Sequence, residues 1–72
     1  MGGIHYAKLK TSERLQRTHW LLRDYQWHGT REIMHAANVC AVNTVIAELR
    51  ANGIGIETVC RGVGHFEYRL ET

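Results

Sequence analysis

One segment limits the fold more than the rest of the chain, and it spans residues 35–53, HAANVCAVNTVIAELRANG. Its apolar residues recur every three or four positions and would share one face of a helix: Val42, Val45, Ile46 and Leu49. Asn38 precedes this pattern, and asparagine tolerates the left-handed backbone of a tight turn better than most residues do. Asn52 and Gly53 follow the pattern as a helix C-cap would. The segment predicts a tight turn and then a helix over about residues 41–51.

The chain before this segment predicts two more helices. The first covers about residues 12–24, with Thr11 or Ser12 as its N-cap. One of its faces carries the following side chains at helical spacing: Leu15, Thr18, Leu21, Leu22 and Tyr25. The second covers about residues 31–37, with Thr30 as its cap and with Ile33, Ala36 and Ala37 toward the core. The connector between them is expected to hold a very short strand at Trp27 and His28.

The tail predicts a β-hairpin, because residues 56–61 and 65–70 flank the sequence Gly-Val-Gly. In the expected register Arg61 faces His65. The same register sets four further pairs: Glu57 with Arg69, Ile56 with Leu70, Thr58 with Tyr68, and Cys60 with Phe66. The first of these is an opposite-charge pair on the outer face, and the other three share the inner face. A slip of one residue would mix the two faces, which favours this register.

These patterns predict one small core in a chain of 72 residues. We expect nine residues to be mostly buried: Leu15, Leu22, Ile33, Val45, Leu49, Ile56, Phe66, Tyr68 and Leu70. Cys40 and Cys60 are too few for a disulfide scaffold and are expected to be small buried residues. Residues 1–10 are expected to form a partly flexible segment ahead of a domain over residues 11–72.

Three helices followed by a hairpin is the order of winged helix-turn-helix proteins, an α+β fold. The stretches TREIMHAANV, AVNTVIAELRANGIGIET and YRL resemble small phage and bacterial winged-helix proteins, over about residues 11–70. The resemblance implies DNA binding as a transcriptional regulator, with the third helix in the major groove and the wing on the backbone. The chain departs from the family at Asn38, where many members have Gly, and at Cys40, where they have Ser or Thr. The missing cap at Cys40 would weaken the helix start by about 1 kcal/mol.

The side chains expected to meet DNA fall into two sets. The outward positions of the third helix face the bases: Ala41, Asn43, Thr44, Ala47, Arg50 and Ala51. Asn can bind adenine, Arg can bind guanine, and the methyl groups of Thr and Ala can pack on thymine. The remaining candidates face the backbone: Lys8, Lys10, Arg14, Arg17, Thr30, Arg31, Arg61 and His65. Residues 1–23 carry five basic side chains and one acidic side chain, so the basic end of the molecule is its N-terminal part.

Three features favour a rival function as a protein-interaction module that inhibits or adapts a host nucleic-acid machine. The third helix is almost neutral, the wing strands carry Glu57 and Glu67, and Trp20 lies away from the apolar face of the first helix. Leaving a tryptophan in water forgoes a few kcal/mol of burial. We therefore expect Trp20 to be covered, either by Ile4 or Tyr6 of the N-terminal segment or by a second copy of the chain in a homodimer.

Several classes of function lack support in the sequence. His28, His35 and Cys40 are the nearest set of metal-binding residue types, but they lack the paired spacing of a zinc site. The chain shows no nucleophile motif and no phosphate-binding glycine loop, so we expect neither an enzyme nor a cofactor. It has no apolar run of about 20 residues and no signal-peptide core. We expect a cytoplasmic protein whose partner is double-stranded DNA.

Overall fold

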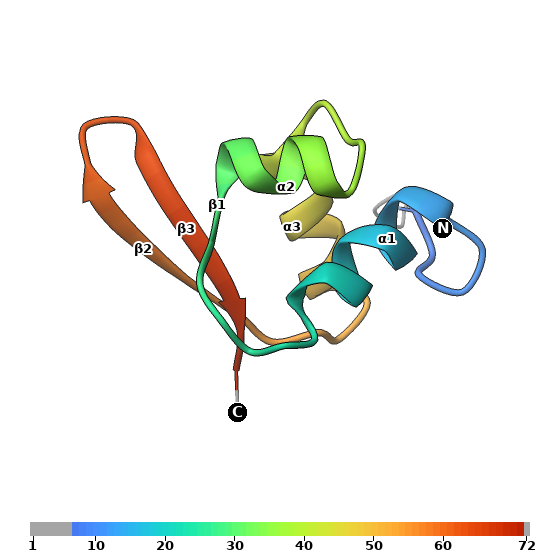
Figure 1. Ribbon diagram of the computed structural model, residues 1–72. Helices are drawn as coiled ribbons and strands as arrows, with labels where there is room; N and C mark the ends of the chain where they lie inside the picture. Colours follow the sequence, from blue (N-terminus) through green and yellow to red (C-terminus); the bar gives the residue numbers. More distant parts are fainter. Residues whose placement is uncertain (1–6, 72) are drawn as a thin grey trace, which may run out of the picture.

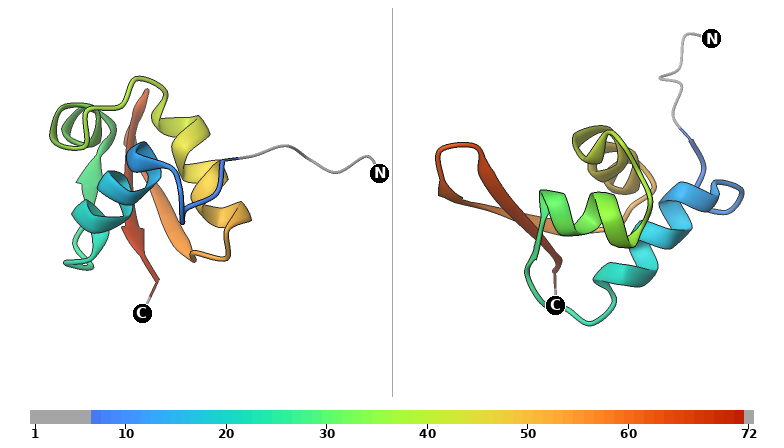
Figure 2. Two further views of the ribbon diagram at one scale, coloured as in Figure 1. Left: turned by 90° about the vertical axis from the view of Figure 1, so that its right-hand side faces the viewer. Right: turned by 45° about the horizontal axis from the view of Figure 1, so that its top comes forward.

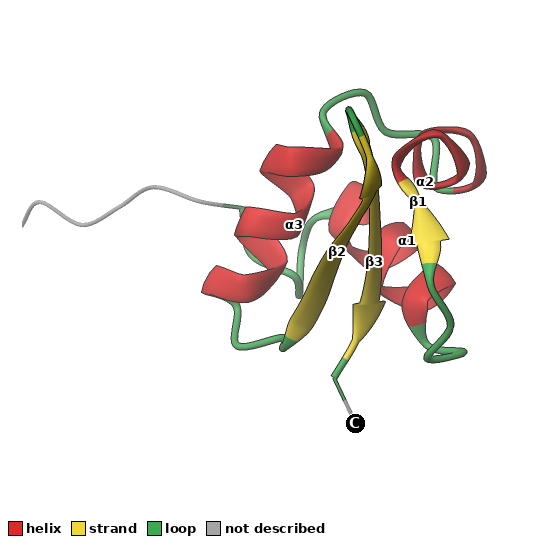
Figure 3. Ribbon diagram, turned by 90° about the vertical axis from the view of Figure 1, so that its left-hand side faces the viewer, coloured by secondary structure: helices red, strands yellow, loops and turns green. Residues whose placement is uncertain are grey.

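The computed structural model describes residues 7–71, which form three helices and a three-stranded antiparallel sheet (Figure 1). The elements follow one another in this order: α1 Glu13–Leu22, β1 His28–Gly29, α2 Thr30–Ala36, α3 Val42–Ala51, β2 Ile56–Gly62 and β3 His65–Leu70. The strands lie in the order β1-β3-β2, with β3 in the centre. The helices cover one face of the sheet and leave the other without a helix (Figure 3). This α+β arrangement is compatible with the winged-helix order.

The helices begin and end close to the predicted residues, for the predicted reasons in most cases. The Ser12 hydroxyl accepts a hydrogen bond from the Leu15 amide and caps α1. Asn38 adopts a φ of +54° between α2 and α3, and Gly53 adopts +90° after α3. The prediction that Thr30 caps α2 is wrong. Thr30 is the first residue of that helix, and its hydroxyl donates to the Phe66 carbonyl at 3.3 Å instead.

The register of the hairpin confirms the four further predicted pairs, from Ile56 opposite Leu70 to Cys60 opposite Phe66. The predicted pair of Arg61 with His65 is wrong. A bulge after Cys60 sets Gly62 opposite His65, so the loop is tighter than expected and Arg61 is the extra residue. The predicted short strand exists one residue later than expected, and its His28 pairs with Tyr68.

The core confirms eight of the nine predicted residues, and it also holds four residues outside that set: Ala37, Val39, Val42 and Ile46. Phe66 was predicted to be buried and is 42% exposed. Cys60 and Cys40 are also exposed, against prediction. The reason for Phe66 and Cys60 is geometric, since the tip of the hairpin extends beyond the helices formed by residues 7–71 (Figure 1).

Two further residues expected to face the core are exposed. Helix α1 ends at Leu22, so Tyr25 lies in the following loop with a φ of +62° and does not extend the apolar face. Ala36 is also exposed, and only Ala37 of the alanine pair is buried. Local periodicity predicted Tyr25 wrongly because α1 stops before the pattern does, whereas Ala36 is the last residue of α2 and lies on the exposed side of that helix.

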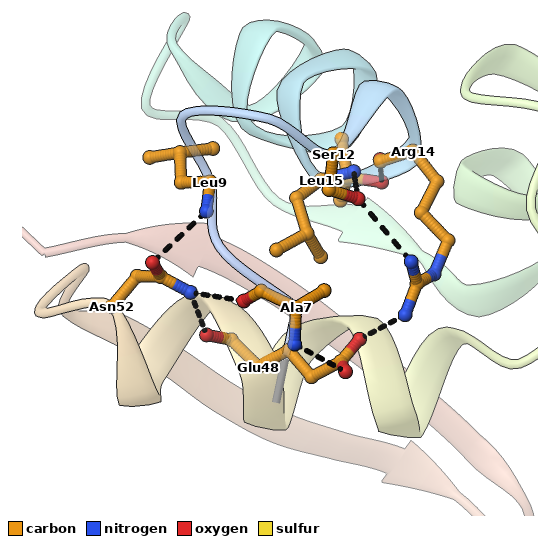
Figure 4. A network of polar contacts seen from close by, with 8 residues as sticks. Ala7, Leu9, Ser12, Arg14, Leu15, Glu48 and Asn52 are labelled. Carbon is orange, nitrogen blue, oxygen red and sulfur yellow. Dashed lines mark hydrogen bonds and ion pairs between the residues drawn. The ribbon is translucent and has the colours of Figure 1, made fainter. Parts of the chain in front are cut away.

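Residues 7–9 are held against α3 by side chains of that helix (Figure 4). The Ala7 amide donates to Glu48 Oε2 at 3.0 Å, and the Leu9 amide donates to Asn52 Oδ1 at 2.9 Å. Asn52 Nδ2 donates in turn to the Ala7 carbonyl at 2.9 Å. Arg14 of α1 forms an ion pair with the same Glu48. The segment before α1 is therefore tied to the end of α3, far along the chain (Figure 2).

Candidate nucleic-acid interface

The outward face of α3 is exposed along its whole length. All six residues predicted to lie on this face are exposed: Ala41, Asn43, Thr44, Ala47, Arg50 and Ala51. The opposite face is buried against the core through Val42, Val45, Ile46 and Leu49. Three of the six exposed residues are alanines and none is acidic. The helix therefore presents a shallow, nearly neutral surface that a groove wall can approach closely.

A hollow separates α3 from the inner face of the hairpin, and two predicted base-reading residues lie along it. Its lining comes from both elements: Asn43, Ile46, Arg50, Thr58, Phe66 and Tyr68. Arg50 is engaged within the protein, because its Nη2 donates at 2.7 Å to both the Ile56 carbonyl and the Thr58 hydroxyl. Arg50 thus ties α3 to β2. Asn43 Oδ1 accepts a hydrogen bond from the Tyr68 hydroxyl at 3.1 Å.

Two arginines of α1 lie at the start of α3. Arg14 and Arg17 border a hollow that also contains Asn38, Cys40, Ala41 and Thr44. Arg14 pairs with Glu48, and Arg17 Nε donates to the Ala37 carbonyl at 2.7 Å. Both side chains stay 42% exposed. Helix α3 begins at this point with no side-chain cap, so positive partial charge and two guanidinium groups meet at one place.

The wing carries cations that neighbouring acids largely neutralise. Arg61 pairs with Glu67 at 3.0 Å, and Arg69 pairs with Glu57 at 2.8 Å. Both guanidinium groups also lie over Trp27, 5.5 Å and 4.4 Å from the ring centre. Because each guanidinium lies beside a carboxylate, these exposed pairs offer a binding partner little net charge. Trp27 was expected only to lie in a short strand, and its contacts with these two arginines were not predicted.

The remaining candidate residues fall into separate places. Thr30, Arg31 and His65 lie together in a hollow between the start of α2 and the hairpin tip. Lys10 precedes α1 and does not line any of the three hollows described above. Within residues 7–71, no ion pair or ring contact involves the side chain of Lys10 or Arg31. These two cations therefore keep their full charge for a partner.

A buried histidine forms a cluster that was not predicted from the sequence. His28 Nε2 lies 2.8 Å from Asp24 Oδ1, and its Nδ1 lies 2.7 Å from Glu32 Oε2. Burial disfavours the charged ring, but the two carboxylates outweigh burial and raise the pKa of His28 above its ordinary value of 6.5. The Gln26 amide and then His28 lower the pKa of Asp24. The sequence signal for this cluster was its spacing, because Asp24, His28 and Glu32 follow one another at intervals of four residues.

Trp20 is 71% exposed on α1, with the Arg23 guanidinium 4.8 Å from its ring centre. It borders a groove on α1 and α2 lined by Glu13, Gln16, Arg17, Leu21 and Ala36. Among the described residues of the N-terminal segment, Ala7 and Leu9 hydrogen-bond to Glu48 and Asn52 at the end of α3. The predicted covering residues Ile4 and Tyr6 lie outside the described residues.

Among residues 7–71 no group of three or more His, Cys, Asp or Glu side chains is arranged to hold a metal ion. No helix in that range is long and apolar enough to cross a membrane. Comparison of the chain with protein-family models, with curated proteins and with solved structures found no match to any of them.

Proposed function

We propose that the chain is a winged-helix protein that binds double-stranded DNA as a small phage or bacterial transcriptional regulator. In this proposal α3 enters the major groove and the β2–β3 hairpin acts as the wing on the backbone. One observation carries the proposal. The outward face of α3 is exposed from Ala41 to Ala51, is free of acids and consists mainly of small side chains.

The arrangement of the elements supports the proposal. Helix α2 leads into α3 through a tight turn at Asn38, and the hairpin follows α3 directly. The hairpin tip extends past the helices on the side of the first residues of α2 (Figure 2). A helix with a projecting hairpin beside it is the arrangement that a winged helix uses to hold both a groove and the adjoining backbone.

The electrostatics predict weak binding that depends moderately on salt. The wing offers few cations, because Arg61 and Arg69 are paired with acids. Arg14 and Arg17 are also paired, with Glu48 and Glu13, but they lie at the start of α3 and stay partly exposed. The main candidates for phosphate contacts are therefore Lys10, Arg14, Arg17 and Arg31. Three or four phosphate contacts give a slope of roughly −3 when the logarithm of affinity is plotted against the logarithm of salt concentration. A protein with a strongly basic face would show a much steeper slope.

The test is a titration of fluorescent mixed-sequence duplex with the protein at low and then at physiological salt. Ala47→Glu adds an acid to the exposed centre of α3, and we expect it to weaken binding about tenfold or more at low salt. His35→Glu is the control, since it adds the same side chain at an exposed position of α2 that does not line the Trp20 groove. Equal binding by both variants would argue against α3 as the contact surface.

A second function is favoured by the neutralised wing and by Trp20. A protein-interaction module needs no free phosphate-binding cations, and an exposed tryptophan is a common anchor at protein interfaces. This alternative takes the place of the first if the wild-type protein fails to bind any duplex at low salt. If the wild type binds duplex and Ala47→Glu abolishes that binding, α3 contacts DNA, and protein interaction is excluded as the role of that helix.

A further inference from the structure

We propose that Tyr68 sets the base preference of the protein by fixing the side chain of Asn43, an inference that rests on the proposed DNA-binding function. Asn43 lies in the first turn of α3, on its exposed face. Its Oδ1 accepts a hydrogen bond of 3.1 Å from the Tyr68 hydroxyl. Tyr68 is therefore a positioning residue, and Asn43 is the residue that would meet the base.

Tyr68 is rigidly held, which allows it to act as a fixed support. It is 5% exposed and lies on β3, the central strand. Its backbone neighbours are His28 on β1 and Thr58 on β2, so the strand is held on both sides. The tyrosine ring has only two rotatable side-chain bonds, and its body is packed in the core. The position of the hydroxyl is consequently set by the sheet and not by the ligand.

The hydrogen bond also sets which atoms of Asn43 face outward. The Tyr68 hydroxyl donates its proton to Oδ1, so Oδ1 is the atom turned toward the hairpin. Nδ2 has no hydrogen-bond partner among residues 7–71, and it carries two N–H donors. Asn43 therefore turns Oδ1 toward the hairpin and leaves the two donors of Nδ2 for the groove. A free asparagine would offer a donor and an acceptor together.

A donor facing the major groove recognises acceptor atoms on base edges. Guanine presents two acceptors there, N7 and O6, and no donor, thymine presents the single acceptor O4, and adenine presents N7 together with the N6 donor. Cytosine presents only a donor. With Oδ1 engaged by Tyr68, Asn43 favours guanine at the base pair that it contacts and discriminates most strongly against cytosine. Release of Oδ1 would shift the preference toward adenine, which takes asparagine through both atoms.

The first experiment needs no DNA. Tyr68→Phe removes the hydroxyl and leaves the buried ring in place. We expect the side-chain NH₂ resonances of Asn43 to change position and to become more mobile by NMR relaxation, while the backbone amides of the core stay unchanged. Tyr25→Phe is the matched control, because Tyr25 is exposed in the loop after α1. Unchanged Asn43 side-chain resonances in Tyr68→Phe would show that the hydroxyl does not fix Asn43 and would overturn the inference.

The second experiment selects preferred sequences from a randomised duplex pool with the wild type, Asn43→Ala, Tyr68→Phe and Tyr25→Phe. We expect the wild type to prefer guanine at one position of its selected site. In Asn43→Ala this preference should fall about fivefold or more. Tyr68→Phe should shift that position toward adenine, and Tyr25→Phe should match the wild type. A wild type that selects nothing would refute the proposed function. A wild type and a Tyr68→Phe variant with the same guanine preference would overturn the inference alone.

Discussion

At the scale of single residues, His28 shows how a buried polar group stays in a thin core. Both ring nitrogens have carboxylate partners, Asp24 from the loop after α1 and Glu32 from α2. No side-chain nitrogen or oxygen buried among residues 7–71 lacks a hydrogen-bond partner. The cluster joins the loop after α1, β1 and α2, so one side chain links three consecutive segments of the chain.

The charge on His28 makes stability depend on pH. The folded pKa of His28 is raised, so its contribution is complete below the unfolded value of about 6.5 and is lost as pH rises through the folded pKa. We expect the urea midpoint of the wild type to fall over that range above pH 6.5. In His28→Gln, which has no titrating ring, the midpoint should fall less.

His65→Gln serves as the control for this comparison, since His65 is exposed at the hairpin tip. It should keep the wild-type pH dependence. At acid pH the contribution of Asp24 to stability changes in the opposite direction, because it decreases as pH falls. Its pKa is lowered from 3.8, so its contribution is lost only as pH falls below that ordinary value. A His28→Gln curve parallel to the wild type above pH 6.5 would contradict the role given to His28.

At the scale of elements, the spacing of apolar residues predicted those features that depend on a single segment of the chain. The buried stripe of α3 and most of the hairpin register follow from spacing within one segment, and the structure confirms both. The bulge after Cys60 and the bond from Arg50 to β2 could not be predicted, because they depend on how two segments meet in space. The exposure of Arg50 follows from its place on α3 and was predicted correctly. Its partners on β2 were not, because they come from another segment.

Helix α3 also anchors the segment before α1, mainly through Asn52. This side chain makes hydrogen bonds to the Leu9 amide, the Ala7 carbonyl and the Glu48 carbonyl. We expect Asn52→Ala to cost about 1–3 kcal/mol of unfolding free energy, because it leaves partly buried backbone groups without partners. Hydrogen exchange at the Leu9 amide should become faster. Exchange in the centre of α3 should change only as far as the decrease in global unfolding free energy requires.

Asn43→Ala provides the comparison for Asn52→Ala, since it removes the same side chain from the exposed face of the same helix. Its Leu9 amide should exchange at the wild-type rate. If Asn52→Ala also leaves that rate unchanged, the segment over residues 7–9 is not held by Asn52.

At the scale of the whole molecule, Trp20 remains without a cover among the described residues. An exposed tryptophan beside a groove favours self-association, and a two-fold dimer would double the sparse set of cations. We expect the wild type to associate with increasing concentration in sedimentation experiments and Trp20→Ala to stay monomeric. Tyr25→Ala, at an exposed aromatic residue outside the groove, should behave as the wild type does. A wild type that is monomeric at all concentrations excludes the dimer.

The order of the strands has a consequence for how the chain acquires its structure during synthesis. Strands β1 and β2 both hydrogen-bond to β3 and not to each other, yet β3 follows every other element. Until Leu70 has left the ribosome, α1, α2 and α3 have no sheet to pack on, and Tyr68 and Leu70 are missing from the core. A chain without β3 would therefore be an unclosed molecule whose apolar helix faces are open to chaperones and proteases.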